Sequence, residues 1–134
     1  MTRDEVLSYV LESYGTEPDF PWRDDNAVLR HDTDRKWYAV LLRVRRSLMG
    51  LPGDGVADVL NIKCDPLMNG TLRQKRGFRP AYHMSKSQWI SILLEEDETP
   101  DAAEVCALLD MSWQMTLGKR RARGGALKRE SDCP

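Results

Sequence analysis

The sequence lacks the long apolar runs, paired cysteines and clustered histidines that mark several large classes of protein. No hydrophobic stretch approaches the about 20 residues that cross a bilayer, and the polar start predicts no secretory signal. The three cysteines are far apart and form no C-x-x-C pair, and the only histidines are His31 and His83. These absences argue against a membrane protein, a disulfide scaffold and a structural zinc site, and they favour a cytoplasmic protein without a metal or cofactor.

The sequence also lacks the common catalytic motifs. It contains no phosphate loop, dinucleotide fingerprint, nucleophile elbow or helical zinc motif. Cys64 and His83 could in principle form a nucleophile and base. No orienting third group or oxyanion motif accompanies them, and a cysteine at the end of a strand is usually a small buried residue. We therefore expect a protein that is not an enzyme.

The length of 134 residues suits one domain with one modest core. The net charge of -1 hides an asymmetry: residues 1–117 hold 14 Lys and Arg against 19 Asp and Glu, whereas residues 118–134 hold 6 against 2. The second segment has no apolar period and contains Gly124 and Gly125. We therefore expect a folded domain over residues 1–117 and a basic, disordered tail over residues 118–134.

Three helical and five extended segments are predicted along residues 1–117. A capping box of Thr2 and Glu5 begins the first helix, and Thr99 and Pro100 are the expected cap and first residue of the last. This order is typical of an α+β domain with an antiparallel sheet and helices packed on it. In chain order, we expect a helix up to Tyr14, strands Ala27–His31, Trp37–Val44 and Val56–Lys63, a helix from Pro66 to about Gln74, extended segments Ala81–Met84 and Gln88–Leu94, and a helix to Gly118.

Positive charge gathers between residues 63 and 86, which hold six Lys and Arg and one acidic residue. Cationic side chains neutralise phosphates, and neighbouring aromatic rings can stack on exposed bases. The cluster is therefore a candidate nucleic-acid-binding surface. Its candidate residues are Lys63, Arg73, Lys75, Arg76, Arg79, His83, Lys86 and Trp89. A second basic group lies on the first predicted hairpin: Arg30, Arg35, Lys36, Arg43, Arg45 and Arg46.

Two other interpretations of this cluster stay open. The basic side chains could form an ordinary solvated face, with their stems packed on the sheet. Alternatively, Lys63, Arg73, His83 and Lys86 could converge on one pocket for a small anion or on a protein partner. The tryptophans fit core positions as well as stacking platforms. Nothing in the sequence specifies an oligomeric state.

Five blocks, in order, resemble the MmcQ/YjbR family of small bacterial proteins. The most specific are Lys63-Cys64-Asp65-Pro66 and Tyr82-His83-Met84, the latter followed by Lys86 and Trp89. The others are Tyr14–Pro18, Trp37–Val40 and Leu109–Trp113. The resemblance implies a CyaY-like fold, also described as double-wing, and a DNA-binding role. On the matching positions, that role would involve Lys63, Arg73, His83, Lys86 and Trp89.

The chain departs from the family pattern in three places. Residues 19–26 read Asp-Phe-Pro-Trp-Arg-Asp-Asp-Asn where a more glycine-rich loop is usual. Ser85 stands where asparagine is common, and Ser112-Trp113 replaces Ser-Tyr. The first departure argues against carrying over a ligand role for that loop, whereas the others leave the expected fold in place.

Overall fold

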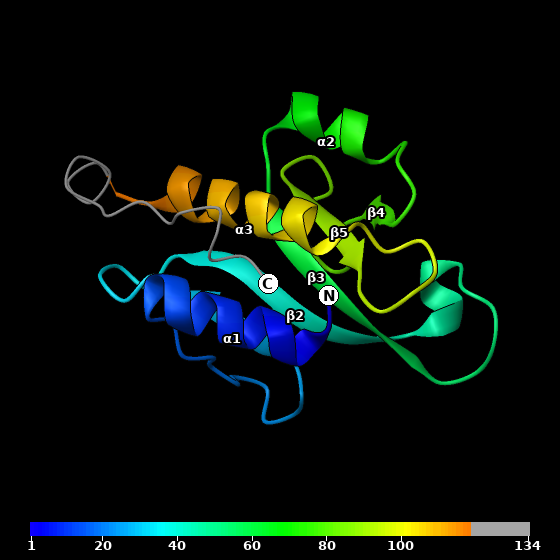
Figure 1. Ribbon diagram of the computed structural model, residues 1–134, viewed down its shortest axis with the longest axis horizontal. Coiled ribbons are helices and arrows are strands. Elements are labelled where there is room, and N and C mark those ends of the chain that lie inside the picture. Colours follow the sequence, from blue (N-terminus) through cyan, green and yellow to red (C-terminus); the bar gives the residue numbers. More distant parts are fainter. Residues whose placement is uncertain (119–134) are drawn as a thin grey trace.

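One antiparallel sheet with two long helices across one of its faces forms the domain, which confirms the predicted α+β architecture (Figure 1). The computed structural model describes residues 1–118, so most of the predicted tail lies outside the described residues. The elements are α1 (Arg3–Tyr14), β1 (Ala27–Arg30), β2 (Trp37–Arg45), the short 3-10 helix η1 (Arg46–Met49), β3 (Val56–Lys63), α2 (Pro66–Leu72), β4 (Phe78–Pro80), β5 (Trp89–Leu93) and α3 (Ala102–Thr116). The strand order is β1–β2–β3–β5–β4, with every neighbouring pair antiparallel.

The first two helices begin as their sequences predict. The Thr2 hydroxyl accepts the backbone N–H of Glu5 at 3.1 Å, and the Glu5 carboxylate accepts the Thr2 N–H at 2.8 Å. Gly15 ends α1 in the left-handed conformation, with φ 70°. The Asp65 carboxylate accepts the backbone N–H of Met68 at 2.8 Å, with Pro66 in the first turn.

The last helix begins two residues later than predicted. Thr99 does not cap it, because the Thr99 hydroxyl donates to the carbonyl of Leu93 at 2.6 Å. Asp101 caps α3 instead and accepts the backbone N–H of Glu104 at 2.9 Å. The prediction of Pro100 as the first helical residue was therefore wrong.

The extended segment predicted at Ala81–Met84 is a turn, and the edge strand β4 lies just before it at Phe78–Pro80. His83 has φ 60°, which is incompatible with a strand. The Tyr82 backbone also bonds to side chains rather than to a neighbouring strand: its N–H donates to Ser91 and its carbonyl accepts from Asn61. Residues 81–88 therefore form a structured loop over the sheet, which we call the 81–88 loop.

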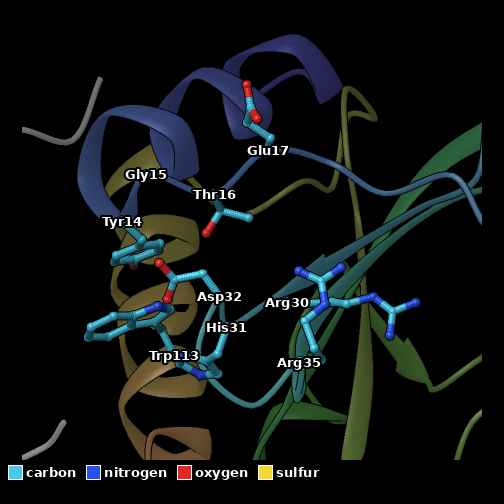
Figure 2. Close-up of a pocket in the computed structure, with 9 residues that line it drawn as sticks. All are labelled: Tyr14, Gly15, Thr16, Glu17, Arg30, His31, Asp32, Arg35 and Trp113. Atoms are coloured by element: carbon cyan, nitrogen blue, oxygen red, sulfur yellow. The ribbon is translucent and has the colours of Figure 1, made fainter.

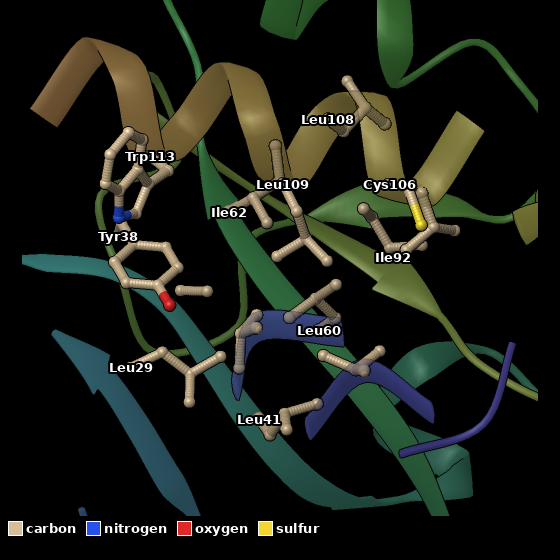
Figure 3. Packing of buried hydrophobic residues seen from close by; sticks show 14 of the residues in the cluster. Leu29, Tyr38, Leu41, Leu60, Ile62, Ile92, Cys106, Leu108, Leu109 and Trp113 are labelled. Carbon is tan, nitrogen blue, oxygen red and sulfur yellow. The ribbon is translucent and has the colours of Figure 1, made fainter. Parts of the chain in front are cut away.

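The main hydrophobic core lies between the sheet and the helices α1 and α3. Leu41, Leu60 and Ile62 of the central strands are fully buried in one cluster with Val10 of α1 and Leu109 of α3 (Figure 3). Truncation of such residues to alanine typically costs about 2–5 kcal/mol. We call this side of the sheet the helix-side face.

The opposite side, the open face, carries a smaller apolar cluster. Val40, Leu42 and Val59 belong to it, together with Met49 of η1. Trp37, Tyr82 and Met84 pack on its margin. No long helix covers this cluster among residues 1–118, but its residues are buried, because η1 and the 81–88 loop pack against them.

A bulge near the start of β2 reverses the side of the sheet on which its first two residues lie. Leu29 pairs with Ala39 but the next residue, Arg30, pairs with Trp37, so Tyr38 is an extra residue in β2. Tyr38 and Ala39 consequently both join the helix-side core, and Trp37 packs on the open face. The bulge thereby places an indole beside Arg30 on the open face.

None of the helices in residues 1–118 has the length and apolar character that a membrane crossing requires.

Candidate nucleic-acid interface

Two cations and two indoles lie at the same end of the sheet on the open face. Arg30 ends β1 and Lys63 ends β3, while Trp37 and Trp89 begin the antiparallel strands β2 and β5. Arg30 pairs with Trp37 across the β1–β2 ladder, and Lys63 pairs with Trp89 across the β3–β5 ladder. The guanidinium carbon of Arg30 lies 5.3 Å from the centre of the Trp37 ring. We call these four residues the cation–indole row.

Asn69 of α2 connects the predicted residue Arg73 to Trp89 of this row. Its side-chain NH₂ donates to the carbonyl of Trp89 at 2.7 Å, and its side-chain oxygen Oδ1 accepts the Nε–H of Arg73 at 2.7 Å. Arg73 also donates to the backbone carbonyl of Lys86. Asn69, Arg73, Lys86 and Trp89 are therefore connected by side-chain hydrogen bonds between α2, the 81–88 loop and β5.

Three cations at this end are not paired with a carboxylate in the described residues. Lys63, Arg73 and Lys86 form no ion pair with a carboxylate within residues 1–118. The Lys86 ammonium instead donates to the carbonyl of Ala81 at 2.8 Å. Arg73 and Lys86 are exposed, and Lys63 is half-buried. These three side chains can therefore meet an anion from solution.

The other predicted cations form ion pairs with carboxylates or lie away from the cation–indole row. Lys75 pairs with Glu104, and Arg79 pairs with Glu98 at 2.8 Å. The hydrogen bond from Arg79 is the largest cause that holds the pKa of Glu98 below its usual value. Arg76 is exposed in the turn before β4. Of the eight candidates, the structure thus brings together Lys63, Arg73, Lys86 and Trp89, with His83 on the adjoining loop.

The basic group on the first hairpin is largely compensated by carboxylates. Arg43 pairs with Asp25 at 2.8 Å and Asp58 at 3.2 Å, and hydrogen bonding to Asp58 raises the pKa of Arg43. Arg46 pairs with Glu96 at 2.8 Å. Arg30, although it belongs to the cation–indole row, also contacts Asp19 at 3.0 Å. The hairpin therefore presents much less free positive charge than its sequence suggests.

A buried polar network fixes the 81–88 loop to the sheet. The Ser91 hydroxyl donates to Asn61 Oδ1 at 2.5 Å and accepts the backbone N–H of Tyr82 at 3.0 Å. The Asn61 NH₂ donates to the carbonyl of Tyr82 at 3.0 Å. Both Asn61 and Ser91 are fully buried. The orientation of Tyr82 and His83 is thus determined by two interior side chains.

This loop forms one wall of a groove of about 460 Å³ on the open face. Tyr82, His83 and Met84 line that side, and Trp22 and Trp37 line the other. Val40 and Leu42 lie between them, and Asp24 and Asn26 complete the lining. The groove is mainly apolar and shares Trp37 with the cation–indole row.

A second hollow, of about 160 Å³, opens beside the end of α1 (Figure 2). The Tyr14 ring stacks on Trp113 with ring centres 4.8 Å apart, and its hydroxyl donates to Asp110. Burial and the Asp110 carboxylate together raise the pKa of Tyr14. Arg30 and Arg35 line the opposite side, and both approach Asp19. Because Glu17 and Asp32 also line it, this hollow has mixed charge and does not favour an anion.

Cys64 and His83 do not form a nucleophile–base pair in this structure. Cys64 is buried in the helix-side core, whereas His83 lines the groove on the open face. Burial is the largest cause that raises the pKa of the Cys64 thiol, which makes it a weaker nucleophile at neutral pH. Asn69 donates to its sulfur at 3.5 Å. Among residues 1–118, no group of three or more His, Cys, Asp or Glu side chains is arranged to hold a metal ion.

Several residues of this candidate interface were not predicted from the sequence. Arg30 was among the predicted basic residues, but nothing in the sequence links it with Trp37, because the bulge that places both side chains on the open face has no sequence signature. Asn61, Asn69 and Ser91 were also missed. A signal existed for Asn61 and Ser91, since each is a polar residue between two apolar neighbours in a strand, and buried polar side chains normally have a bonding role.

The comparisons with known proteins agree with the resemblance noted in the sequence. The YjbR family model matches residues 11–115. The uncharacterised protein YyaQ of Bacillus subtilis (strain 168) is 40% identical over 118 residues, which are 87% of this chain and 98% of that protein. A crystal structure of a protein from Pseudomonas syringae has a TM-score of 0.83 and 39% identity, and covers 87% of this chain and 100% of that one.

A more distant structure supports the fold alone. Deinococcus radiodurans protein DR2400, which contains a DUF419 domain, has a TM-score of 0.67 and 24% identity, and the match covers 94% of this chain and 88% of that one. The family match extends from within α1 to near the end of α3 and so includes every strand of the sheet. On this match and the 40% identity to YyaQ, the chain belongs to the YjbR family.

Proposed function

We propose that this protein is a non-enzymatic DNA-binding protein of the cytoplasm that holds single strands on the cation–indole row. The observation that carries the proposal is the alternation of Arg30, Trp37, Lys63 and Trp89 across one end of the sheet. Arg73 and Lys86 extend this surface with charges that no carboxylate in residues 1–118 neutralises.

The chemistry of the row suits a flexible strand. Lys63, Arg73 and Lys86 can each neutralise a phosphate, which releases condensed counterions. Indole faces on a sheet can stack on bases that are not already paired, at about 1–3 kcal/mol per base. A duplex hides those base faces inside its own stack, so only its phosphates remain available. The surface should therefore prefer single-stranded to double-stranded DNA.

The alternative of a small-anion site has less support. It requires Lys63, Arg73, His83 and Lys86 to converge on one pocket. Lys86 lines a shallow hollow with Arg79 and Pro80, whereas His83 lines the apolar groove. The basic side chains are therefore spread over a surface and do not converge on one pocket. A spread of this kind is expected for a ligand with several phosphates along a chain.

Fluorescence anisotropy with a labelled oligothymidine tests the proposal. Binding should be detectable at low salt, and three phosphate contacts predict that log K falls by roughly 2 per tenfold increase in salt. A duplex of equal length should bind more weakly. The absence of binding to single strands at low salt, or binding that does not respond to salt, would contradict a DNA-binding function.

A further inference from the structure

The groove beside the cation–indole row has a lining that suits a flat ring. Trp22 meets Trp37 edge to face, with ring centres 6.1 Å apart, and forms one wall. Tyr82 and His83, with ring centres 4.0 Å apart, form part of the other. Val40 and Leu42 contribute apolar surface between the walls. Aromatic walls around an apolar floor favour a planar, largely apolar occupant.

Both walls are held in conformations that side-chain-bearing residues rarely adopt. Arg23, next to Trp22, has φ 58°, and His83 has φ 60°. Such conformations are strained and persist where surrounding contacts impose them, often at ligand sites. On the loop side, Asn61 and Ser91 supply these contacts. On the Trp22 side, the Asp24 carboxylate accepts the backbone N–H of Asn26 at 2.8 Å.

Asp24 and Asn26 add polar atoms to the lining of this mainly apolar groove. The side-chain oxygen Oδ1 of Asn26 accepts the backbone N–H of Arg43 at 2.8 Å, which anchors the Trp22 loop to β2. Asp24 also lines the groove, and its carboxylate has lone pairs beyond those bonded to Asn26. An acceptor beside aromatic walls matches a planar ring that carries N–H donors on its edge. A nucleobase has this combination, whereas a purely aliphatic ligand does not.

We infer that the groove receives one unstacked base of a single DNA strand whose phosphates lie along the cation–indole row. Trp37 belongs to both the groove and the row, so a strand on the row passes directly beside the groove. Arg30 lies over the Trp37 ring at that junction with its guanidinium paired to Asp19, so the free positive charge for the strand comes from Lys63. This inference rests on the proposed function and adds the part of the DNA that is recognised there.

The four tryptophan indole N–H signals in a nitrogen–proton correlation spectrum test the inference. Trp22 and Trp37 line the groove, Trp89 reports on the row, and Trp113 on the helix-side face is an internal control. Millimolar deoxyadenosine should shift the Trp22 and Trp37 signals and leave Trp113 unchanged. Inorganic phosphate alone should not shift the Trp22 signal. Absence of groove shifts with the nucleoside would overturn the inference.

A matched pair of variants extends the test to DNA. Trp22 and Phe20 lie on the same loop and are 49% and 44% exposed, but only Trp22 lines the groove. Trp22→Ala should weaken oligonucleotide binding about tenfold, as loss of one base stack does. Phe20→Ala should leave it unchanged. An oligonucleotide that contains only abasic sites should bind both variants and the wild type equally.

The outcomes separate this inference from the proposed function. If the oligonucleotide binds and Trp22→Ala has no effect on its affinity, the groove does not bind a base. The inference is then wrong, and the proposed DNA-binding function of the cation–indole row is unaffected. If deoxyadenosine shifts Trp22 and Trp37 but no oligonucleotide binds, the groove takes the ring and the DNA-binding function fails. If an apolar peptide shifts these signals and the nucleoside does not, the groove binds a protein segment and the inference is wrong.

Discussion

The hydroxyl of Ser112 accepts the backbone N–H of Lys63 at 3.0 Å, across the interface between α3 and the sheet. The same hydroxyl donates to the carbonyl of Tyr38 at 2.5 Å. Tyr38 is the extra residue of the β2 bulge, where the β2–β3 ladder ends. The buried Ser112 side chain thus supplies hydrogen bonds where the β2–β3 ladder has ended. At this point Trp37 of β2 and Lys63 of β3 lie on the open face.

Replacement of Ser112 by alanine should destabilise the fold. The variant leaves the Lys63 N–H and the Tyr38 carbonyl without their side-chain partner, and such losses in a protein interior cost about 1–3 kcal/mol. Urea unfolding should show this decrease in the free energy of unfolding. Ser47→Ala, at an exposed position in η1, should change it by less than about 0.5 kcal/mol. Equal effects of the two substitutions would contradict the role of Ser112.

The link between Ser91 and the 81–88 loop gives a second prediction. Ser91→Ala removes the acceptor for the Tyr82 N–H and the donor to Asn61, so this amide should exchange with solvent faster than in the wild type. The free energy of unfolding should also fall by about 1–3 kcal/mol. Ser87→Ala, exposed within the same loop, is the control for hydrogen exchange. Unchanged protection of Tyr82 in the Ser91 variant would show that the loop is held by other contacts.

The fold could be predicted from the sequence where local chemistry decides the structure. The Thr2–Glu5 capping box and the Asp65-Pro66 start correctly located two helices, because those contacts form within one turn. The cap at Thr99 failed because its hydroxyl bonds to Leu93, a contact outside the helix. The strand predicted at Ala81–Met84 failed for a similar reason, since the buried side chains of Asn61 and Ser91 hold this segment as a turn.

The interface could be predicted only in part. Clustering in the sequence located Lys63, Arg73, Lys86 and Trp89, because the strand ends and α2 that carry them adjoin in space. The engagement of Lys75 by Glu104 and of Arg79 by Glu98 depends on chain segments 29 and 19 residues away. A count of local charge cannot include such distant carboxylates, and it therefore overstated the free positive charge.

The Arg79–Glu98 pair predicts a specific pH dependence. The pKa of Glu98 is lowered in the folded state, so its carboxylate stabilises the fold above the ordinary value of about 4.3. This contribution should disappear as the pH falls through the lower folded-state pKa. Wild type should exceed Glu98→Gln in unfolding free energy by about 0.2–1 kcal/mol near neutral pH, and the difference should vanish in acid.

Urea unfolding of both proteins between neutral pH and about pH 3 measures that difference. Asp97→Asn changes an exposed neighbour that forms no ion pair within residues 1–118, and should show no such pH-dependent difference. A difference between wild type and Glu98→Gln that stays constant across the range would contradict the assignment of the pKa shift to this pair.

The most direct test of the proposal that the cation–indole row binds DNA is a pair of charge reversals on the sheet. Lys63→Glu acts within the row, whereas Arg45→Glu makes the same change in charge at the other end of β2, on an exposed side chain without an ion pair in residues 1–118. Anisotropy with a single-stranded oligonucleotide should show weaker binding by Lys63→Glu and a salt slope smaller in magnitude by about 0.7, since one phosphate contact is lost. Arg45→Glu should keep the wild-type slope. Equal losses in the two variants would mean that only net charge attracts DNA, and the cation–indole row would not be its binding site.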